Sequence, residues 1–318
     1  MATISVCMIV KNEEKTLAKC LDSLRGLYEE LIIVDTGSTD KTKEIAARYT
    51  DKIYDFEWID DFAAARNYAF SLATKEYIYS ADADESLDEV NRERFKILKE
   101  AMLPEIEVVQ MKYGNQLENG TVYNYDEEYR PKLFRRLRTF TWIDPIHETI
   151  RVFPVVFDSD IIITHKQEEI HAKRDFRIFE KEIVKGNPLS SRLIDLYARE
   201  LYLAGEIEDL EKAEGYFKAI AENDEFISEL MLDACAVLVK YHNMLGKPIS
   251  SCTYVGIAND LGGCSEVCVE LARYYIKQGE YEAARAELER AMNETEPVLD
   301  INCGEEIPRE LLTSIVKK

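Results

Sequence analysis

Three carboxylates crowd into four positions of this chain. Asp82, Asp84 and Glu85 directly follow the short, aromatic-rich segment 76–81, which is typical of a buried strand. Such crowding costs Coulomb energy unless a cation or hydrogen-bond donors offset it. In an extended segment, Asp82 and Asp84 would leave the same face, and two oxygens there suit Mg²⁺ or Mn²⁺ with positions open for phosphate oxygens. The alternative is an acidic turn that caps a helix starting near Asp88.

The preceding elements predict where this acidic run lies. Residues 4–10 and 31–34 are apolar on both faces, as in strands of a parallel sheet covered by helices. Amphipathic stretches alternate with the strands, which predicts βαβ units and a mostly parallel sheet. Ligands of such sheets bind beyond the carboxyl ends of the strands. We therefore expect Val10, Asp35 and Asp82 to line one crevice.

Local signals also predict helix ends. We expect Asn12 to cap the first helix, with Glu13 and Glu14 in its first turn, where the helix dipole favours acids. Ser38, Thr39 or Asp40 should cap the second helix. No glycine-rich dinucleotide or phosphate-loop motif follows the first strand, so side chains and a metal must hold any nucleotide.

Residues 103–164 have a different pattern, typical of a mixed or antiparallel sheet, with strands expected at 106–111, 121–125, 132–135 and 152–157. A basic run lies within this stretch. Its Arg130, Arg135 and Arg136 are candidates to neutralise a diphosphate or to orient an acceptor, although alternating basic residues on an edge strand usually form a solvated face.

Composition excludes several classes of protein. The formal net charge of −21 argues against a nucleic-acid partner. No run of about 18 apolar residues predicts a membrane span, and the first residues lack the features of a signal peptide. The seven cysteines are scattered without a zinc-site spacing. Reduced thiols and a cytoplasmic location are the expectation.

From Asp175 onward the pattern is almost wholly helical. Ala198-Arg199 precedes Gly205-Glu206 at the same spacing at which Ala272-Arg273 precedes Gly279-Glu280. A weaker unit, around residues 236–258, lies between them. This internal similarity predicts tetratricopeptide-like helix–turn–helix units. An ordinary helical cap on the first domain is the alternative.

Four blocks, taken in order, resemble a known family. They are Val10-Lys11-Asn12-Glu13-Glu14, Ile33-Val34-Asp35-Thr36-Gly37-Ser38-Thr39-Asp40, Ala64-Ala65-Arg66-Asn67 and Asp82-Ala83-Asp84-Glu85. Together they resemble glycosyltransferases of family 2, and the similarity covers about residues 3–165. The most similar branch joins this domain to tetratricopeptide-like helices and includes bacterial enzymes that glycosylate peptides or proteins. The resemblance implies an α/β, GT-A nucleotide-diphospho-sugar transferase domain at residues 1–170 and an all-α domain at 171–318.

The resemblance also implies roles for individual positions. Nucleotide-binding roles fall on Ile9, Val10, Lys11, Glu13, Asp35, Arg66 and Asp82. Within that set, Asp35 would bind the base and Arg66 the base or the diphosphate. In a DxD-type motif, Asp84 would ligate Mn²⁺ or Mg²⁺ together with Asp82, and His165 resembles the late metal-binding histidine of many such enzymes. Ile9 and Lys11 stand where family members often carry an aromatic residue or threonine.

Inverting sugar transfer needs a carboxylate that takes the proton of the acceptor. The candidate is Glu148, in a Pro-Ile-His-Glu block that resembles the His-Glu segment of this branch, with Asp144 in reserve. The sequence thus predicts a metal-dependent glycosyltransferase that moves a hexose or N-acetylhexosamine from a UDP-sugar to a peptide or protein. The helical tail would hold that acceptor or mediate homo-oligomerisation. A sugar-nucleotide nucleotidyltransferase and a non-catalytic scaffold with a relic nucleotide fold are the alternatives.

Overall fold

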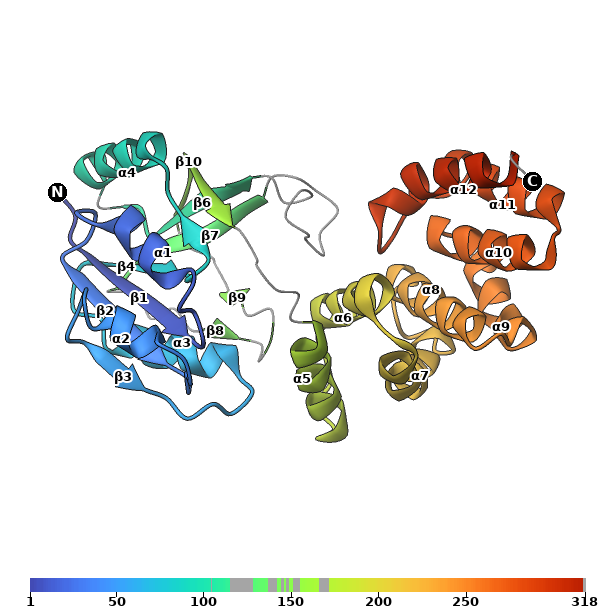
Figure 1. The fold of residues 1–318 in the computed structure, drawn as a ribbon, viewed down its shortest axis with the longest axis horizontal. Coiled ribbons are helices and arrows are strands. Elements are labelled where there is room, and N and C mark those ends of the chain that lie inside the picture. The colour runs from blue at the N-terminus through green and yellow to red at the C-terminus, as the bar shows by residue number, and fades with distance from the viewer. Residues whose placement is uncertain are drawn as a thin grey trace. The chain divides into compact units, whose positions relative to one another are not determined.

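The computed structural model describes residues 1–103, 105–114, 128–136, 142–143, 146, 149–150, 155–165 and 172–316. These residues divide into two compact units. The described residues up to His165 form an α/β unit, and those from Ala172 onward form a helical unit (Figure 1).

The α/β unit is built on one mixed sheet. Its described strands are ordered β3 (Ile53–Asp55), β2 (Glu30–Asp35), β1 (Ile4–Val10), β4 (Tyr77–Ala81), β7 (Glu128–Arg135), β6 (Val108–Gly114), β10 (Val156–His165) and β5 (Glu85–Ser86). The first four are parallel, as the βαβ pattern predicts. Strand β7 runs antiparallel to both β4 and β6, and β10 is parallel to β6. A separate pair joins β8 (Trp142–Ile143) to β9 (Thr149–Ile150).

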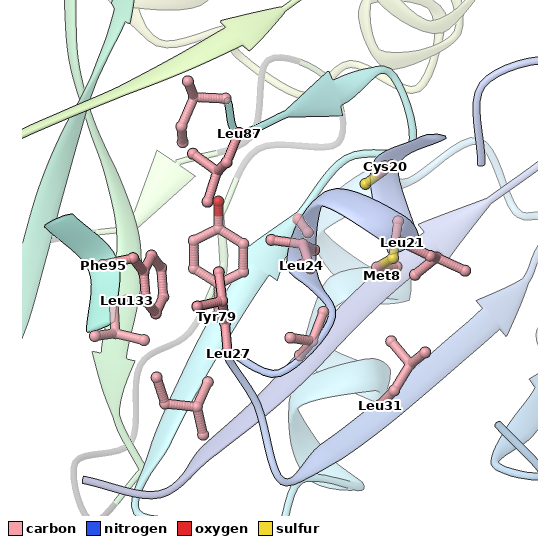
Figure 2. Close-up of a cluster of buried hydrophobic side chains, with 14 of the residues drawn as sticks. Met8, Cys20, Leu21, Leu24, Leu27, Leu31, Tyr79, Leu87, Phe95 and Leu133 are labelled. Atoms are coloured by element: carbon pink, nitrogen blue, oxygen red, sulfur yellow. The ribbon is translucent and has the colours of Figure 1, made fainter. Parts of the chain in front are cut away.

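Helices cover both faces of the parallel strands. On one face, α1 (Leu17–Leu24), α2 (Thr42–Ala46) and α4 (Glu89–Ala101) contribute to one large apolar cluster. Figure 2 shows the ring of Tyr79 at the centre of this cluster, among Leu24, Phe95 and Leu133. On the other face, α3 (Phe62–Ser71) packs Ala69 against β1, β2 and β4.

Three local predictions are wrong. The N-cap of α2 is Lys41 and not Ser38, Thr39 or Asp40, although Asp40 Oδ1 accepts from the backbone N–H of Thr42 at 2.9 Å. Asn12 does not cap the first helix: α1 begins at Leu17, and Asn12 lies in the left-handed region with φ 58°. Its side-chain oxygen instead accepts a hydrogen bond from the backbone N–H of Thr39 at 2.8 Å. The basic segment around Lys132 is not an edge strand, because β7 lies between β4 and β6. The place of β7 inside the sheet depends on long-range strand pairing, which leaves no local signal in the sequence.

The helical unit contains α5 (Ala172–Val184), α6 (Ser191–Ala204), α7 (Ile207–Ala221), α8 (Ser228–Met244), α9 (Pro248–Asp260), α10 (Ser265–Gln278), α11 (Tyr281–Asn293) and α12 (Glu306–Val316). The repeated Gly-Glu pairs occupy equivalent places. Gly205 follows α6 and Gly279 follows α10, and each glycine precedes the glutamate at the start of the next helix. Gly279 has φ +79°, a conformation that glycine adopts without steric cost. The predicted units therefore coincide with helix–turn–helix segments.

No helix in the described ranges is long and apolar enough to cross a bilayer.

Candidate active site

The loops that follow β1 and β2 are hydrogen-bonded to each other. The backbone N–H of Asn12 donates to Ser38 Oγ at 3.0 Å, and that of Glu13 donates to Thr42 Oγ1 at 2.6 Å. Together with the bond from Thr39 to Asn12, these contacts fix two loops at the carboxyl ends of neighbouring parallel strands. Such loops line the ligand crevice in open α/β sheets.

Asp35 ends β2 and lies opposite Val10 in the strand register, as predicted. Its Oδ1 accepts hydrogen bonds from the backbone N–H groups of Gly37 at 3.0 Å and Ser38 at 2.9 Å. Its Oδ2 is buried and has no hydrogen-bond partner among the described residues. Burying a carboxylate oxygen without a donor is costly, so this atom is suited to accept from an N–H or O–H group of a ligand.

The acidic run is a turn rather than an extended segment, so the alternative of a turn is correct for its backbone. The N–H of Glu85 donates to the carbonyl oxygen of Asp82 at 3.1 Å, and the N–H of Asp82 donates to Glu85 Oε2 at 3.2 Å. Asp88, three residues on, caps α4 by accepting from the backbone N–H of Asn91. In this conformation the side chain of Glu85 is buried, whereas Asp82 and Asp84 are partly exposed.

Arg66 of α3 binds the first carboxylate of the turn. Its Nη2 donates to Asp82 Oδ1 at 2.7 Å, and its Nη1 donates to Ser80 Oγ at 3.1 Å. The guanidinium carbon lies 4.8 Å from the ring centroid of Trp142, within the range of a cation–π contact. Burial raises the pKa of the Asp82 carboxyl, but Arg66 and Lys132 outweigh it and hold that pKa well below its usual range. Asp82 is therefore ionised.

Lys132 of β7 is a second buried cation beside the turn, and the sequence analysis did not single it out. Its Nζ lies 2.7 Å from Glu85 Oε1 and 3.6 Å from Asp82 Oδ2, and it donates to Tyr113 Oη at 3.1 Å. Lys132 is 4% exposed and Glu85 is 3% exposed. No local sequence signal identifies it, because the burial of Glu85 and the place of β7 between β4 and β6 depend on long-range packing.

The carboxylates that face the crevice are not all neutralised by these cations. Burial raises the pKa of Glu13, its hydrogen bond from Thr16 opposes the rise, and the nearby charges of Asp84 and Asp82 add to it. This mutual repulsion is what a divalent cation would relieve. Mg²⁺ is commonly held by one or two carboxylates plus substrate phosphates. The donor set fits that arrangement rather than an all-protein cage, since no three candidate ligand side chains cluster in the described part of the chain.

The other predicted site residues are distributed as follows. His165 pairs with Glu85 in the β10–β5 register, which brings its backbone next to the acidic turn. The side chain of Val10 lies in the core, and its carbonyl oxygen accepts a hydrogen bond from Thr36 Oγ1. Ile9 packs on the face of the sheet that α3 covers, and Lys11 is exposed. Glu148 and Asp144 lie outside the described residues, as does the side chain of His165.

The basic run does not supply a uniform set of cations to the crevice. Arg130 is ion-paired with Glu128 at 2.7 Å, and Arg136 donates to the carbonyl oxygen of Lys75 at 2.6 Å. Residue 75 precedes β4, so Arg136 lies at the end of that strand opposite to the acidic turn. Lys132, in the middle of β7, directs its charge to Asp82 and Glu85.

The α/β unit thus places the buried Asp35 Oδ2 atom, which has no hydrogen-bond partner among the described residues, and the Asp82–Glu85 turn at the carboxyl ends of parallel strands of one sheet. By comparison of sequences, residues 5–161 match the family described as glycosyl transferase family 2. The domain that these residues form belongs to that family. A glycosyltransferase domain of GT-A type followed by helices is therefore the fold class, as predicted.

Individual relatives match over different lengths. A tetratricopeptide repeat-containing protein of Synechococcus elongatus is 47% identical over 87 residues, which are 27% of this chain and 22% of that protein. The glycosyltransferase SunS of Bacillus subtilis is 28% identical over 258 residues, 76% of this chain and 60% of that protein. The chain thus spans less than two thirds of either relative. The solved structure of Staphylococcus aureus TarS is 15% identical, covers 78% of this chain and 54% of that one, and has a TM-score of 0.40.

Proposed function

We propose that this protein is an inverting, metal-dependent glycosyltransferase that moves a hexose or N-acetylhexosamine from a UDP-sugar to a peptide or protein. The observation that carries the proposal is Asp35 Oδ2, a buried acceptor without a described partner at the end of β2, on the same edge of the parallel sheet as the Asp82–Glu85 turn that follows β4. The N–H group of a uracil edge is a donor of the kind that this oxygen lacks.

Different residues would bind different parts of the UDP-sugar. Asp35 would accept a hydrogen bond from the base. Asp82, ionised and oriented by Arg66, would accept hydrogen bonds from ribose hydroxyls or coordinate the cation. Asp84, with His165 as a further candidate, would hold Mg²⁺ or Mn²⁺. That ion would supply positive charge for the departing diphosphate. Glu148 is proposed to take the proton of the acceptor as its nucleophilic atom attacks the anomeric carbon and the bond to the diphosphate breaks.

The helical unit supports a peptide or protein acceptor. A groove of about 360 Å³ lies between α8, α9, α10 and α11. Its walls combine apolar and aromatic side chains such as Val255, Leu271 and Tyr274 with polar ones, among them the charged Glu270, Glu287 and Arg290. Such a mixture offers apolar contacts and hydrogen-bonding or charged groups to a peptide at the same time. Tyr274→Ala should raise the KM for a large acceptor and leave hydrolysis of the sugar nucleotide unchanged.

A thermal-shift titration with UDP, GDP and dTDP, with and without Mn²⁺, tests the donor site. Asp35→Asn keeps an oxygen for Gly37 and Ser38 but replaces Oδ2 with an NH₂ group, which cannot accept. Wild type at a hundred times the dissociation constant should gain about 2.7 kcal/mol of stability, and Asp35→Asn should lose that gain. Asp84→Asn should lose only the part that depends on Mn²⁺. Glu100→Gln, an exposed acid at the end of α4, is the control.

The outcomes discriminate between the candidate functions. A shift with another nucleotide would replace UDP as the donor class, and no shift with any nucleotide would favour the non-catalytic scaffold. Release of pyrophosphate instead of UDP during turnover would favour the nucleotidyltransferase.

A further inference from the structure

Asn67 makes a two-point contact with the backbone of Trp142. Its Oδ1 accepts from the Trp142 N–H at 2.8 Å, and its Nδ2 donates to the Trp142 carbonyl oxygen at 3.1 Å. A side-chain amide has the same donor and acceptor as a peptide unit, so Asn67 pairs with β8 as a neighbouring strand would. Among the described strands, β8 pairs with β9 only.

Trp142 in turn packs against Arg66. Its ring lies 4.8 Å from the guanidinium carbon, and the rings of Phe70 and Phe134 meet it edge-on at 5.8 and 6.0 Å. The indole therefore covers Arg66 from one side. The polar edge of the same guanidinium binds Asp82 and Ser80 at the end of β4.

We propose that Asn67 is a positioning residue for the donor site. By holding the Trp142 backbone, it keeps the indole against Arg66, and the covered guanidinium then keeps Asp82 in one orientation. Asn67 and Arg66 are consecutive residues of α3. One helix therefore positions both the amide that binds the Trp142 backbone and the guanidinium that binds Asp82. The effect on donor binding rests on the proposed function, whereas the effect on Trp142 and Arg66 does not.

The chain offers a direct probe of this arrangement, because it contains two tryptophans. Trp58→Phe leaves Trp142 as the single tryptophan. In that background, Asn67→Ala should increase acrylamide quenching of Trp142 and shift its emission to longer wavelength. Arg66→Gln should change the emission of Trp142 strongly when Asn67 is present and weakly when it is alanine, because interacting residues give non-additive effects.

Asn91→Ala is the matched control. Asn91 likewise lies on a helix, and its Oδ1 also accepts from a strand N–H, that of Ile162 at 2.9 Å. It is buried where Asn67 is partly buried, and it belongs to α4, away from the contacts described for Trp142 and Arg66. It should lose stability without changing the quenching. The dissociation constant of UDP with Mn²⁺ should rise about tenfold in Asn67→Ala, the equivalent of about one hydrogen bond, and stay unchanged in Asn91→Ala.

Unchanged quenching of Trp142 in a folded Asn67→Ala protein would overturn the proposal, as would additive effects of Asn67→Ala and Arg66→Gln. If Asn67→Ala does not fold, Asn67→Asp replaces it. Aspartate keeps the acceptor for the Trp142 N–H and loses the donor to its carbonyl oxygen, so wild-type quenching there would also overturn the proposal. If wild type binds no nucleotide, the proposed function fails, and the ligand-free fluorescence still decides whether Asn67 holds Trp142 against Arg66.

Discussion

Removing the buried charge of Lys132 should destabilise the α/β unit strongly. Lys132→Met leaves Glu85 buried at 3% exposure, without the ammonium group that lies 2.7 Å from its carboxylate. At an effective dielectric constant of about 20, charges roughly 3 Å apart attract by about 5 kcal/mol, and desolvation of both groups offsets part of this. Breaking a buried pair from one side typically costs about 3–5 kcal/mol. Because burial already raises the pKa of Glu85 to about 7, the Glu85 carboxyl of Lys132→Met can take up a proton at neutral pH, so we expect a loss of about 3 kcal/mol at pH 7 and a larger one at pH 8.

A double-mutant cycle with Glu85 tests whether the loss of stability comes from the unpaired carboxylate. In Lys132→Met/Glu85→Gln, both charges are gone and the glutamine amide occupies nearly the volume of the carboxylate. The double variant should therefore regain most of the lost stability, since a buried pair replaced on both sides is often nearly neutral. Lys99→Met is the control. Lys99 is equally buried, but the carboxylate of its partner Glu29 is 38% exposed, so water can solvate it and the cost should be smaller.

Urea unfolding followed by tryptophan fluorescence is the appropriate assay. Trp58 and Trp142, the two tryptophans of the chain, both belong to the α/β unit, so the signal reports on that unit alone. A loss of less than about 1 kcal/mol in Lys132→Met, or a double variant no more stable than Lys132→Met, would refute the assignment of Lys132 as the necessary countercharge of Glu85.

Two further predictions concern catalysis and pH. Glu148→Gln should bind the UDP-sugar normally and lose transfer about 10²–10⁴-fold in single-turnover assays, because the acceptor proton has no base; transfer at the wild-type rate would exclude that role. Burial raises the pKa of Asp233 in α8 to about 8, above its value of about 3.9 in unfolded chains. The neutral carboxyl thus stabilises the helical unit below pH 4, and this contribution is lost as the pH rises through 8. Asp233→Asn should raise the thermal unfolding temperature at pH 8 but not at pH 4, and an equal rise at both would contradict the reasoning.

Sequence patterns predicted the first half of the α/β unit closely, because its determinants are local. Apolar runs bounded by turn residues place β1, β2 and β4, and the alternation with helices implies that their carboxyl ends meet. Asp35 and Asp82 accordingly lie at strand ends, as expected. The helical unit was predictable for the same reason, since the periodic apolar positions and the Gly-Glu pairs are short-range signals.

What the sequence analysis missed depends on partners distant in the chain. Asn12 has the composition of a helix cap, but Thr39, 27 residues later, takes its side-chain oxygen. Lys132 lies in a run typical of a solvated edge, yet pairing with β4 and β6 buries it beside Glu85, 47 residues earlier. In the sequence Asn67 stands out only as part of the Ala-Ala-Arg-Asn block, because its contact with Trp142 spans 75 residues. Each case is a long-range contact that overrides a local preference.

The charges of the crevice bear on the proposed need for a metal. Arg66 and Lys132 are the buried cations beside the acidic turn in the described structure, and each is paired with a carboxylate of the turn. They therefore offset the protein's own acids and contribute little net positive charge to a diphosphate. Asp84 and Glu13 add further negative charge in the same place, in a chain whose net charge is already −21. These acids would repel a diphosphate at short range. A divalent cation held by Asp84 would make the local charge positive and so attract the diphosphate. It follows that nucleotide binding should depend on the metal even where the sugar is absent, so UDP without Mn²⁺ should bind far more weakly than UDP with it.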